Sequence, residues 1–256
     1  MRLISLNIWG GRLFNDLAKF LEREKERTNV FCFQEVLYYK LGEPTRDSVE
    51  FKSMLQPDGS PQIPDLHPRL QSLLPDFNGF LSEPYTPGME RLATFVKKDM
   101  NAKVETIQIH KSVKAEFRGK EFGTSCLMQH TQLEIDGDTY DISNTHGIWQ
   151  GTSKEDTPER LEQSRAMVDA LSGFSKRKVL CGDFNLLPDT ESIKTIENYM
   201  RNLIRENEIT NTRSTYYKYP DRFADYIFVS PTIKIGRFSV LQDEISDHLP
   251  LLLDFT

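Results

Sequence analysis

Short apolar runs that stop abruptly at polar residues are the main pattern of this chain. The clearest example is Lys178 to Asn185, where Val-Leu-Cys is followed by Gly182 and then by Asp183 and Asn185. Such a run is typical of a buried strand that presents polar side chains at its carboxyl end. Because residues two apart in an extended chain point to the same side, Asp183 and Asn185 are predicted to share one face.

The same pattern recurs along the chain and predicts a domain rich in strands. Further strands are predicted at residues 2–6, 30–33, 77–81, 92–96, 104–109, 125–135, 139–143, 223–229, 233–241 and 249–255. Apolar residues at helical spacing predict helices over 13–26, from Thr157-Pro158 onward and over about 190–207, with a short helix at 66–74. Strands with a few interspersed helices indicate a layered α/β (α+β) domain.

Two stretches depart from this pattern. Residues 38–69 contain five prolines and predict a long irregular loop, for which we favour a place beside a substrate over a mobile insertion. Residues 110–123 are rich in lysine and predict a basic loop, which either covers a substrate or is solvated surface.

Length and charge limit the possible classes of protein. The 256 residues fit one large domain, and we expect a single domain over residues 1–256. A net charge of −6 and a pI of about 5.5 exclude a global basic field, so a polyanionic substrate would need local cations or a metal. Cys32, Cys126 and Cys181 lie in apolar runs and are predicted to be buried free thiols. No signal peptide or membrane-spanning run is evident, so we expect a cytoplasmic protein. We also expect a monomer.

Polar residues suited to binding a metal or a phosphate gather at the ends of the apolar runs: Asn7, Glu35, His146, Asp183, Asn185, Asp225, Asp247 and His248. They lack the short spacing and the cysteine pairs of a zinc site. Their oxygen donors suit Mg²⁺, Mn²⁺ or Ca²⁺. Mg²⁺ commonly binds one or two protein carboxylates and completes its shell with water and substrate phosphate. The pattern therefore favours a metal site that handles phosphate.

Six short motifs carry these residues: Leu-Asn-Ile-Trp-Gly, Phe-Gln-Glu-Val, Asn-Thr-His-Gly, Gly-Asp-Phe-Asn, Ala-Asp-Tyr-Ile-Phe and Ser-Asp-His-Leu-Pro. In this set and order, over nearly the whole chain, the sequence resembles the endonuclease/exonuclease/phosphatase superfamily, with the DNase I-like fold. The resemblance implies a four-layered sandwich of two packed mixed sheets flanked by helices. Ser-Glu-Pro at 82–84 with Glu-Arg at 90–91 is similar to the pancreatic-type deoxyribonuclease branch.

Hydrolysis of a phosphodiester in line needs an activated water and neutralisation of the phosphoryl oxygens. We expect Asp183 to orient or deprotonate the water and Asn185 to fix its position. Asn7 and Glu35, with Asp247 nearby, are expected to hold Mg²⁺ or Mn²⁺ against a phosphate oxygen.

Two histidines are expected to donate to the phosphoryl group or the leaving oxygen. The resemblance pairs Glu90 with His146 and Asp225 with His248, and such carboxylates would raise the pKa of each imidazole. For the first pair we predict a hydrogen bond of about 2.7 to 3.2 Å. The alternative is that Glu90 is an ordinary surface acid.

Trp9 stands where some DNA-repair members have an acidic residue, which argues against a close abasic-site endonuclease. It is either a platform for stacking a base or a core residue.

The leading hypothesis is a divalent-metal-dependent phosphodiesterase, an endo- or exonuclease acting on nucleic acid. The alternative is a phosphatase or phospholipase C-like hydrolase, of the sphingomyelinase or inositol-phosphate kind, which acts on a small or lipid phosphoester. The acidic pI is compatible with that alternative. A catalytically inactive binding module is least favoured, because no expected catalytic position is substituted.

Overall fold

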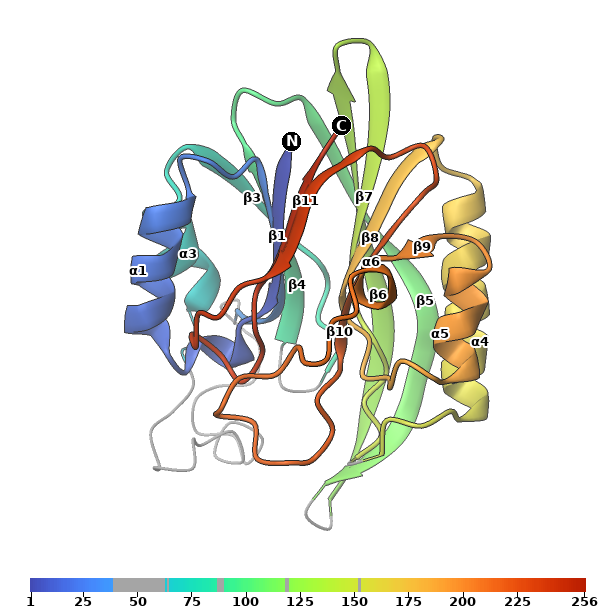
Figure 1. Cartoon of the computed structure of the whole chain (residues 1–256). Coiled ribbons are helices and arrows are strands. Elements are labelled where there is room, and N and C mark those ends of the chain that lie inside the picture. The colour runs from blue at the N-terminus through green and yellow to red at the C-terminus, as the bar shows by residue number, and fades with distance from the viewer. Residues whose placement is uncertain (39–62, 64, 87–89, 118–119, 152) are drawn as a thin grey trace.

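Two six-stranded sheets stack face to face and helices cover their outer faces (Figure 1). This computed structural model describes residues 1–38, 63, 65–86, 90–117, 120–151 and 153–256. The predicted four-layered α/β sandwich is therefore confirmed.

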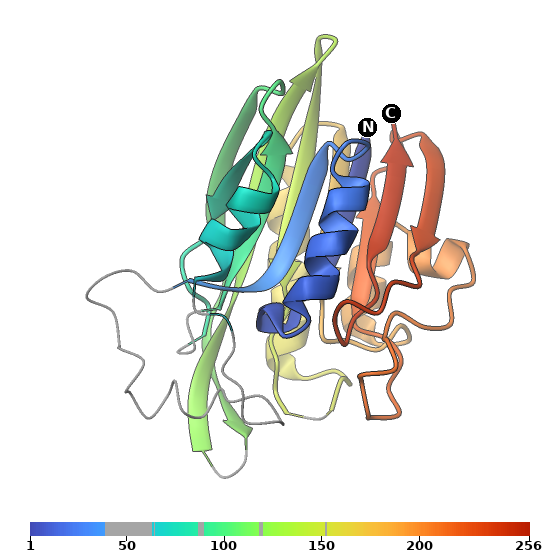
Figure 2. The same cartoon turned by 90° about the vertical axis from the view of Figure 1, so that its left-hand side faces the viewer.

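The first sheet has the strand order β11-β12-β1-β2-β4-β3. Its strands are β1 (Arg2–Asn7), β2 (Val30–Leu37), β3 (Phe77–Leu81), β4 (Glu90–Lys97), β11 (Ile235–Val240) and β12 (Leu251–Phe255). The outer face is covered by α1 (Phe14–Glu24) and α3 (Leu66–Leu73), which Figure 2 shows in front of the strands. A single 3-10 turn, η1 (Trp9–Gly11), follows β1.

The second sheet has the order β5-β6-β7-β8-β10-β9. Its strands are β5 (Ala102–Phe117), β6 (Lys120–Ile135), β7 (Asp138–His146), β8 (Arg177–Asp183), β9 (Arg201–Asn202) and β10 (Asp225–Val229). On its outer side lie α4 (Pro158–Ser172) and α5 (Glu191–Glu197), with the short α6 (Leu203–Glu206) next to β9 (Figure 1).

The strands fill two cores because successive side chains point to opposite faces. Along β1, Leu3 belongs to the core shared with the second sheet, whereas Ile4 packs under α1 and α3. The three cysteines are buried and free, as predicted, and Cys32 and Cys181 pack in the same core from opposite sheets.

Two predictions from the sequence were wrong. The described residues of 110–123 form strands where a basic loop was expected, because the cross-strand pairing of β5 with β6 continues to Phe117 opposite Lys120. The single helix expected over 190–207 is broken into α5, β9 and α6. α5 ends at Glu197, and Asn202 pairs with β10, while its side chain accepts from the amides of Ile204 and Arg205 to cap a new helix.

The predicted helix at 66–74 is confirmed as α3. Residues 39–62 and 64 of the predicted irregular loop lie outside the described residues. In the described part of the chain, no helix is both long enough and apolar enough to cross a membrane.

The carboxyl ends of β1, β2, β7 and β8 meet at one end of the sandwich. β1 is parallel to β2 and β7 to β8, and Asn7 at the end of β1 contacts Asp183 at the end of β8. Both chain termini lie at the opposite end (Figures 1 and 2), where the Met1 amine donates to the Phe255 carbonyl at 2.6 Å.

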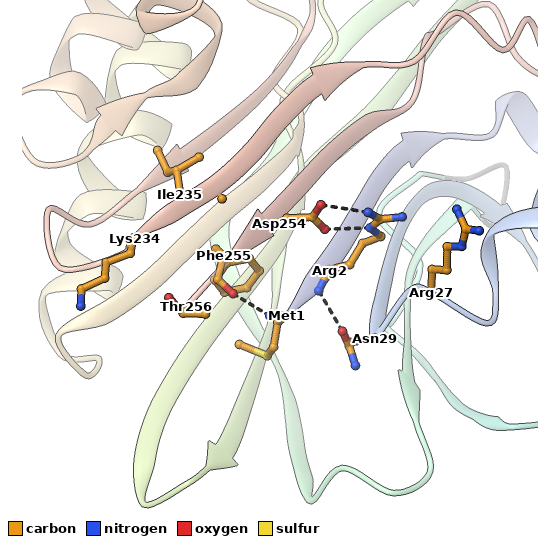
Figure 3. A pocket seen from close by; sticks show the side chains of 10 residues that line it. Met1, Arg2, Arg27, Asn29, Lys234, Ile235, Asp254, Phe255 and Thr256 are labelled. Carbon is orange, nitrogen blue, oxygen red and sulfur yellow. Dashed lines mark hydrogen bonds and ion pairs between the residues drawn. The ribbon is translucent and has the colours of Figure 1, made fainter.

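A cavity of about 510 Å³ opens beside the termini (Figure 3). Its lining is Met1, Arg2, Arg27, Asn29, Lys234, Ile235, Gly236, Asp254, Phe255 and Thr256. These residues include no member of the predicted site. They include the start of β1 and the end of β12, whereas the predicted site lies where β1 ends.

Candidate active site

The Asp183 carboxylate lies at the centre of the predicted site. It ends β8, is 2% exposed, and has its Oδ2 atom 3.5 Å from Nε2 of both His146 and His248. Its Oδ1 atom accepts from the backbone amide of Asn185 at 2.9 Å. The carboxylate is therefore held rigidly between two imidazoles.

Glycine at position 182 permits this arrangement. A Cβ atom there would lie 2.0 Å from the Thr145 carbonyl oxygen of the neighbouring strand, and Gly182 has a φ of +142°. Only glycine allows this close approach of β8 to β7, which brings Asp183 beside His146.

Asn7 joins Asp183 to Glu35. Its amide nitrogen donates to Glu35 Oε1 at 2.9 Å and to Asp183 Oδ2 at 3.0 Å. Its amide oxygen accepts from the backbone N–H of Trp9 at 3.0 Å, which fixes the orientation of the amide.

Three residues around Asn7 and Asp183 have left-handed backbone conformations. The φ angles are +51° at Trp9, +56° at Glu35 and +53° at Asn185. At Glu35 the register of β2 with β4 shifts, so a β-bulge turns its side chain toward the site. Such conformations cost about 1–2 kcal/mol for residues other than glycine, and they collect where a side chain must be aimed.

His146 ends β7 and is held by a tyrosine. Its Nδ1 atom lies 2.7 Å from the Tyr85 hydroxyl, which also accepts from the backbone N–H of Glu35 at 3.0 Å. Nε2 faces Asp183 and lies 3.1 Å from the Asn185 amide nitrogen.

The structure has a hydrogen bond between His146 and Tyr85 where a direct one between His146 and Glu90 was predicted. Tyr85 occupies Nδ1 instead, because Glu90 begins β4 and is turned toward Thr86, whose hydroxyl donates to it at 3.2 Å. Glu90 nevertheless acts on His146 through its charge.

His248 has the carboxylate partner that the sequence predicted. Its Nδ1 atom donates to Asp225, with distances of 2.8 and 2.9 Å to the two oxygens. Thr212 donates to the same carboxylate at 2.9 Å. The guanidinium of Arg213 contacts His248 Nε2 and lies 3.3 Å from Asp247 Oδ2. Asp247 is thus tied to the site through Arg213.

The buried charges shift the protonation of the site in opposite directions. Burial lowers the pKa of His146, but the Asp183 carboxylate outweighs it, and with the charges of Glu35 and Glu90 this pKa rises from 6.5 to about 9. Burial favours a raised pKa for Asp183, yet the facing imidazoles of His248 and His146 hold it well below its usual range. At neutral pH the site therefore pairs a carboxylate with an imidazolium.

The donor groups fit a hard divalent cation. One ligand atom each from Glu35, His146 and Asp183 lie within 4.8 Å of one another, and the same holds for Asp183, Asp225 and His248. The Glu35 and Asp183 carboxylates both accept from the neutral amide nitrogen of Asn7, so a cation bound here would neutralise two negative charges. Oxygen donors of this kind suit Mg²⁺ or Mn²⁺.

A family model described as the Endonuclease/Exonuclease/phosphatase family matches residues 4–248. This span includes every residue of the site described above. The chain belongs to the endonuclease/exonuclease/phosphatase family. Its buried histidine, aspartate and glutamate residues form the site of a phosphoester hydrolase of that family.

Solved structures share the fold at low sequence identity. The mannosyl-6-phosphatase of Bacteroides thetaiotaomicron VPI-5482 is 15% identical with a TM-score of 0.69, over 100% of this chain and 99% of that one. The human Nocturnin catalytic domain with bound sulfate anion is 18% identical with a TM-score of 0.62, covering 100% and 93%. A humanized D. rerio TDP2 is 14% identical with a TM-score of 0.65, covering 100% and 98%. No match was found among curated protein sequences.

The family motifs did not reveal three residues near the site. Tyr85 directly follows the Ser-Glu-Pro segment, but a tyrosine in a loop has no pattern of its own. Arg213 and Lys154 lie in polar stretches that read as surface, although they are only 4% and 5% exposed. Burial of a cation is a tertiary property, so the spacing of apolar and polar residues carries no signal for Arg213 or Lys154.

Glu90→Gln is expected to lower the pKa of His146. Burial and the charge of Glu35 raise the pKa of Glu90 to about 7, so near neutral pH this carboxyl is only partly charged. Removing its charge weakens the support for the imidazolium, and the limb of the pH–rate profile that needs protonated His146 moves to lower pH. Titration of the His146 ring signals by NMR measures the shift directly.

Glu83→Gln is the matched control, because the Glu83 side chain is 80% exposed. It should leave the titration of His146 unchanged. An equal shift in both variants, or none in Glu90→Gln, would show that Glu90 exerts no specific influence on this histidine.

Proposed function

We propose that the protein hydrolyses phosphoesters with the help of a divalent metal ion. The observation that carries this proposal is the Asp183 carboxylate, which lies 3.5 Å from Nε2 of both His146 and His248 and shares the Asn7 amide with Glu35. A base, an acid and a place for a cation thus converge where β1, β2, β7 and β8 end.

Glu35 and Asp183, with Asn7 between them, would hold Mg²⁺ or Mn²⁺, and Asp247 is proposed as a further ligand. A bound ion would withdraw charge from a phosphoryl oxygen.

Asp183 is proposed to orient the attacking water and take its proton. Its depressed pKa keeps it ionised for this role. Asn185, whose backbone amide already bonds Asp183 at 2.9 Å, would fix the water with its side chain.

His146, with its pKa near 9, would donate a proton from Nε2 to a phosphoryl or leaving oxygen. Asp225 holds the Nδ1 proton of His248, so Nε2 is the atom of His248 that would face the phosphoryl group.

Among phosphoesters, we propose a phosphodiester of nucleic acid as the first substrate class. The support comes from aromatic residues near the site. Trp9 is half-buried there, the Arg12 guanidinium lies 4.4 Å from the centre of its ring, and the Tyr216 ring centre lies 6.4 Å away. Tyr216 is 41% exposed. Aromatic side chains flanked by arginine are suited to stacking on bases.

A small phosphomonoester is the second candidate. It is favoured by two buried cations, Lys154 and Arg213, on the His248 side of the site and by the net charge of −6, which offers no global attraction to a polyanion. The structural relative named mannosyl-6-phosphatase indicates that the fold serves a substrate of this class.

Hydrolysis is expected to require a divalent metal. Excess EDTA should abolish turnover, and Mg²⁺ or Mn²⁺ should restore it. Glu35→Ala should raise the Mg²⁺ concentration needed for half-maximal activity more than any other single change, because it removes one of the two carboxylates that Asn7 joins. Full activity in excess EDTA would contradict the proposal.

The substrate class is tested with a panel assayed at saturating Mg²⁺. It comprises single- and double-stranded DNA, RNA, 5′-phosphotyrosyl DNA, sphingomyelin, inositol phosphates, a sugar phosphate and bis-p-nitrophenyl phosphate. Preference for a nucleic acid, together with a raised KM for that substrate in Trp9→Ala, would support the first candidate. Preference for a phosphomonoester would support the second.

A further inference from the structure

Lys154 is a buried lysine that the mechanism above does not use. Its backbone carbonyl accepts from Leu187, two residues after Asn185, at 3.0 Å. Its ammonium donates to the carbonyl of Phe223, two residues before Asp225, at 2.9 Å. The segment that follows β8 and the segment that precedes β10 therefore both bond the lysine.

Arg213 lies on the same side of the site and shares an aromatic partner with this lysine. The Tyr217 ring has the Arg213 guanidinium carbon 4.2 Å from its centre and the Lys154 ammonium 5.0 Å from it. Arg213 also contacts Nε2 of His248, the atom that faces the proposed phosphoryl position. Lys154 and Arg213 thus both contact the Tyr217 ring, and Arg213 lies directly beside His248.

The two cations differ in their partners: the charges of Asp183, Asp225 and Asp247 surround Arg213, but Lys154 hydrogen-bonds to no carboxylate among the described residues. Arg213 has Asp247 at 3.3 Å, whereas the single hydrogen-bond acceptor of the Lys154 ammonium among the described residues is a neutral carbonyl. Burial and the neighbouring charge of Arg213 lower the pKa of Lys154 to about 8. A buried ammonium in this setting is stabilised by an anion that enters the site.

We propose that Lys154 and Arg213 form a subsite for a phosphoryl dianion, and that they favour a terminal phosphate, as in a phosphomonoester, over an internal phosphodiester. This inference rests on the proposed phosphoester hydrolysis and deepens its second candidate.

The number of unesterified oxygens is the physical reason. The Glu35 side of the site would meet one oxygen through the cation, and His146 with Asn185 would meet a second. The cation pair lies on a third side, beside His248. A phosphomonoester has a third charged oxygen for this side, whereas a phosphodiester would place an uncharged ester chain against two buried cations.

Lys154→Gln tests the subsite and keeps an N–H donor for the Phe223 carbonyl. Hydrolysis of p-nitrophenyl phosphate and of bis-p-nitrophenyl phosphate is compared at saturating Mg²⁺, since the two share a leaving group. We expect kcat/KM for the monoester to fall roughly 10- to 100-fold and that for the diester to change less than about threefold. Inorganic phosphate, titrated calorimetrically into the Mg²⁺-loaded protein, should bind about tenfold or more weakly.

Lys178→Gln is the matched control. Lys178 is also a buried lysine beside a tyrosine, with its ammonium 5.4 Å from the Tyr199 ring, but it lies near the opposite end of β8 from Asp183. It should change neither the ratio of the two activities nor the affinity for phosphate. Melting curves of both variants report whether the fold is kept, and Lys154→Met replaces Lys154→Gln if the latter does not fold.

The outcomes separate this subsite from the proposed function. Equal losses on both substrates, or phosphate binding that Lys154→Gln leaves unchanged, would overturn the subsite while hydrolysis stands. The wild-type protein could instead hydrolyse neither ester and still bind phosphate more tightly than Lys154→Gln does. That result would support the subsite and overturn the proposed function.

Discussion

Asp183→Asn should reduce kcat by about a hundredfold or more, with the fold retained. The carboxylate is proposed to take the proton of the attacking water, and an amide cannot do so. Loss of one such transition-state interaction commonly costs this much. The change keeps the shape of the side chain, so an oxygen remains to accept from the amide of Asn185.

The variant has a second readout that a merely structural role would not produce. Asp183 makes the largest contribution that raises the pKa of His146, so this pKa should fall toward its ordinary value of 6.5 when the charge is removed. Asp189→Asn, at a side chain that is 87% exposed, is the control and should leave both the rate and the titration unchanged. A near-wild-type rate in Asp183→Asn with a normal melting curve would refute the assignment.

His248→Ala should likewise abolish turnover, again by about a hundredfold or more. The substitution removes the imidazole that faces the phosphoryl position and leaves Asp225 with Thr212 as its remaining donor in the described contacts. Leaving a buried carboxylate short of a partner also costs about 1–3 kcal/mol of stability. Steady-state kinetics and thermal melting measure the two effects separately.

His130→Ala is the matched control for this variant. His130 is buried, lies 2.7 Å from the Asp141 carboxylate and stacks on Phe174, so it loses a similar interaction away from the site. Its melting temperature should fall to a similar extent while kcat stays near wild type. A comparable loss of kcat in both variants would mean that His248 acts through stability and not through chemistry.

The sequence alone determined where the strands lie and which residues stand at their ends. Period-two alternation with abrupt polar ends is a local property, because it follows from the geometry of one strand packed on a core. For this reason β1, β2, β7 and β8 were predicted close to their observed places. The order of the motifs along the chain then predicted the fold. That fold in turn predicted that the strand ends meet.

Local patterns failed where a local and a non-local interaction compete. The apolar spacing over residues 190–207 is helical throughout, but Asn202 makes more favourable contacts as a strand residue beside β10 and as the cap of α6. The lysine-rich stretch 110–123 has the composition of a loop, yet its described residues pair between β5 and β6. The pairing of Asn202 with Phe228 lies beyond a short window of sequence, whereas the partner strand of residues 110–117 directly follows them.

Only the tertiary structure decided which residues of the site contact one another. Tyr85, 61 residues before His146, occupies the ring nitrogen that the sequence assigned to Glu90, and Arg213, 35 residues before His248, reaches its Nε2. Hydrogen bonds are made by whichever donor the packing brings within about 3 Å, and distance along the chain does not limit that choice. The sequence therefore determined the motif residues of this site, and the packing of the two sheets decided which of them touch and which further residues, such as Tyr85 and Arg213, join them.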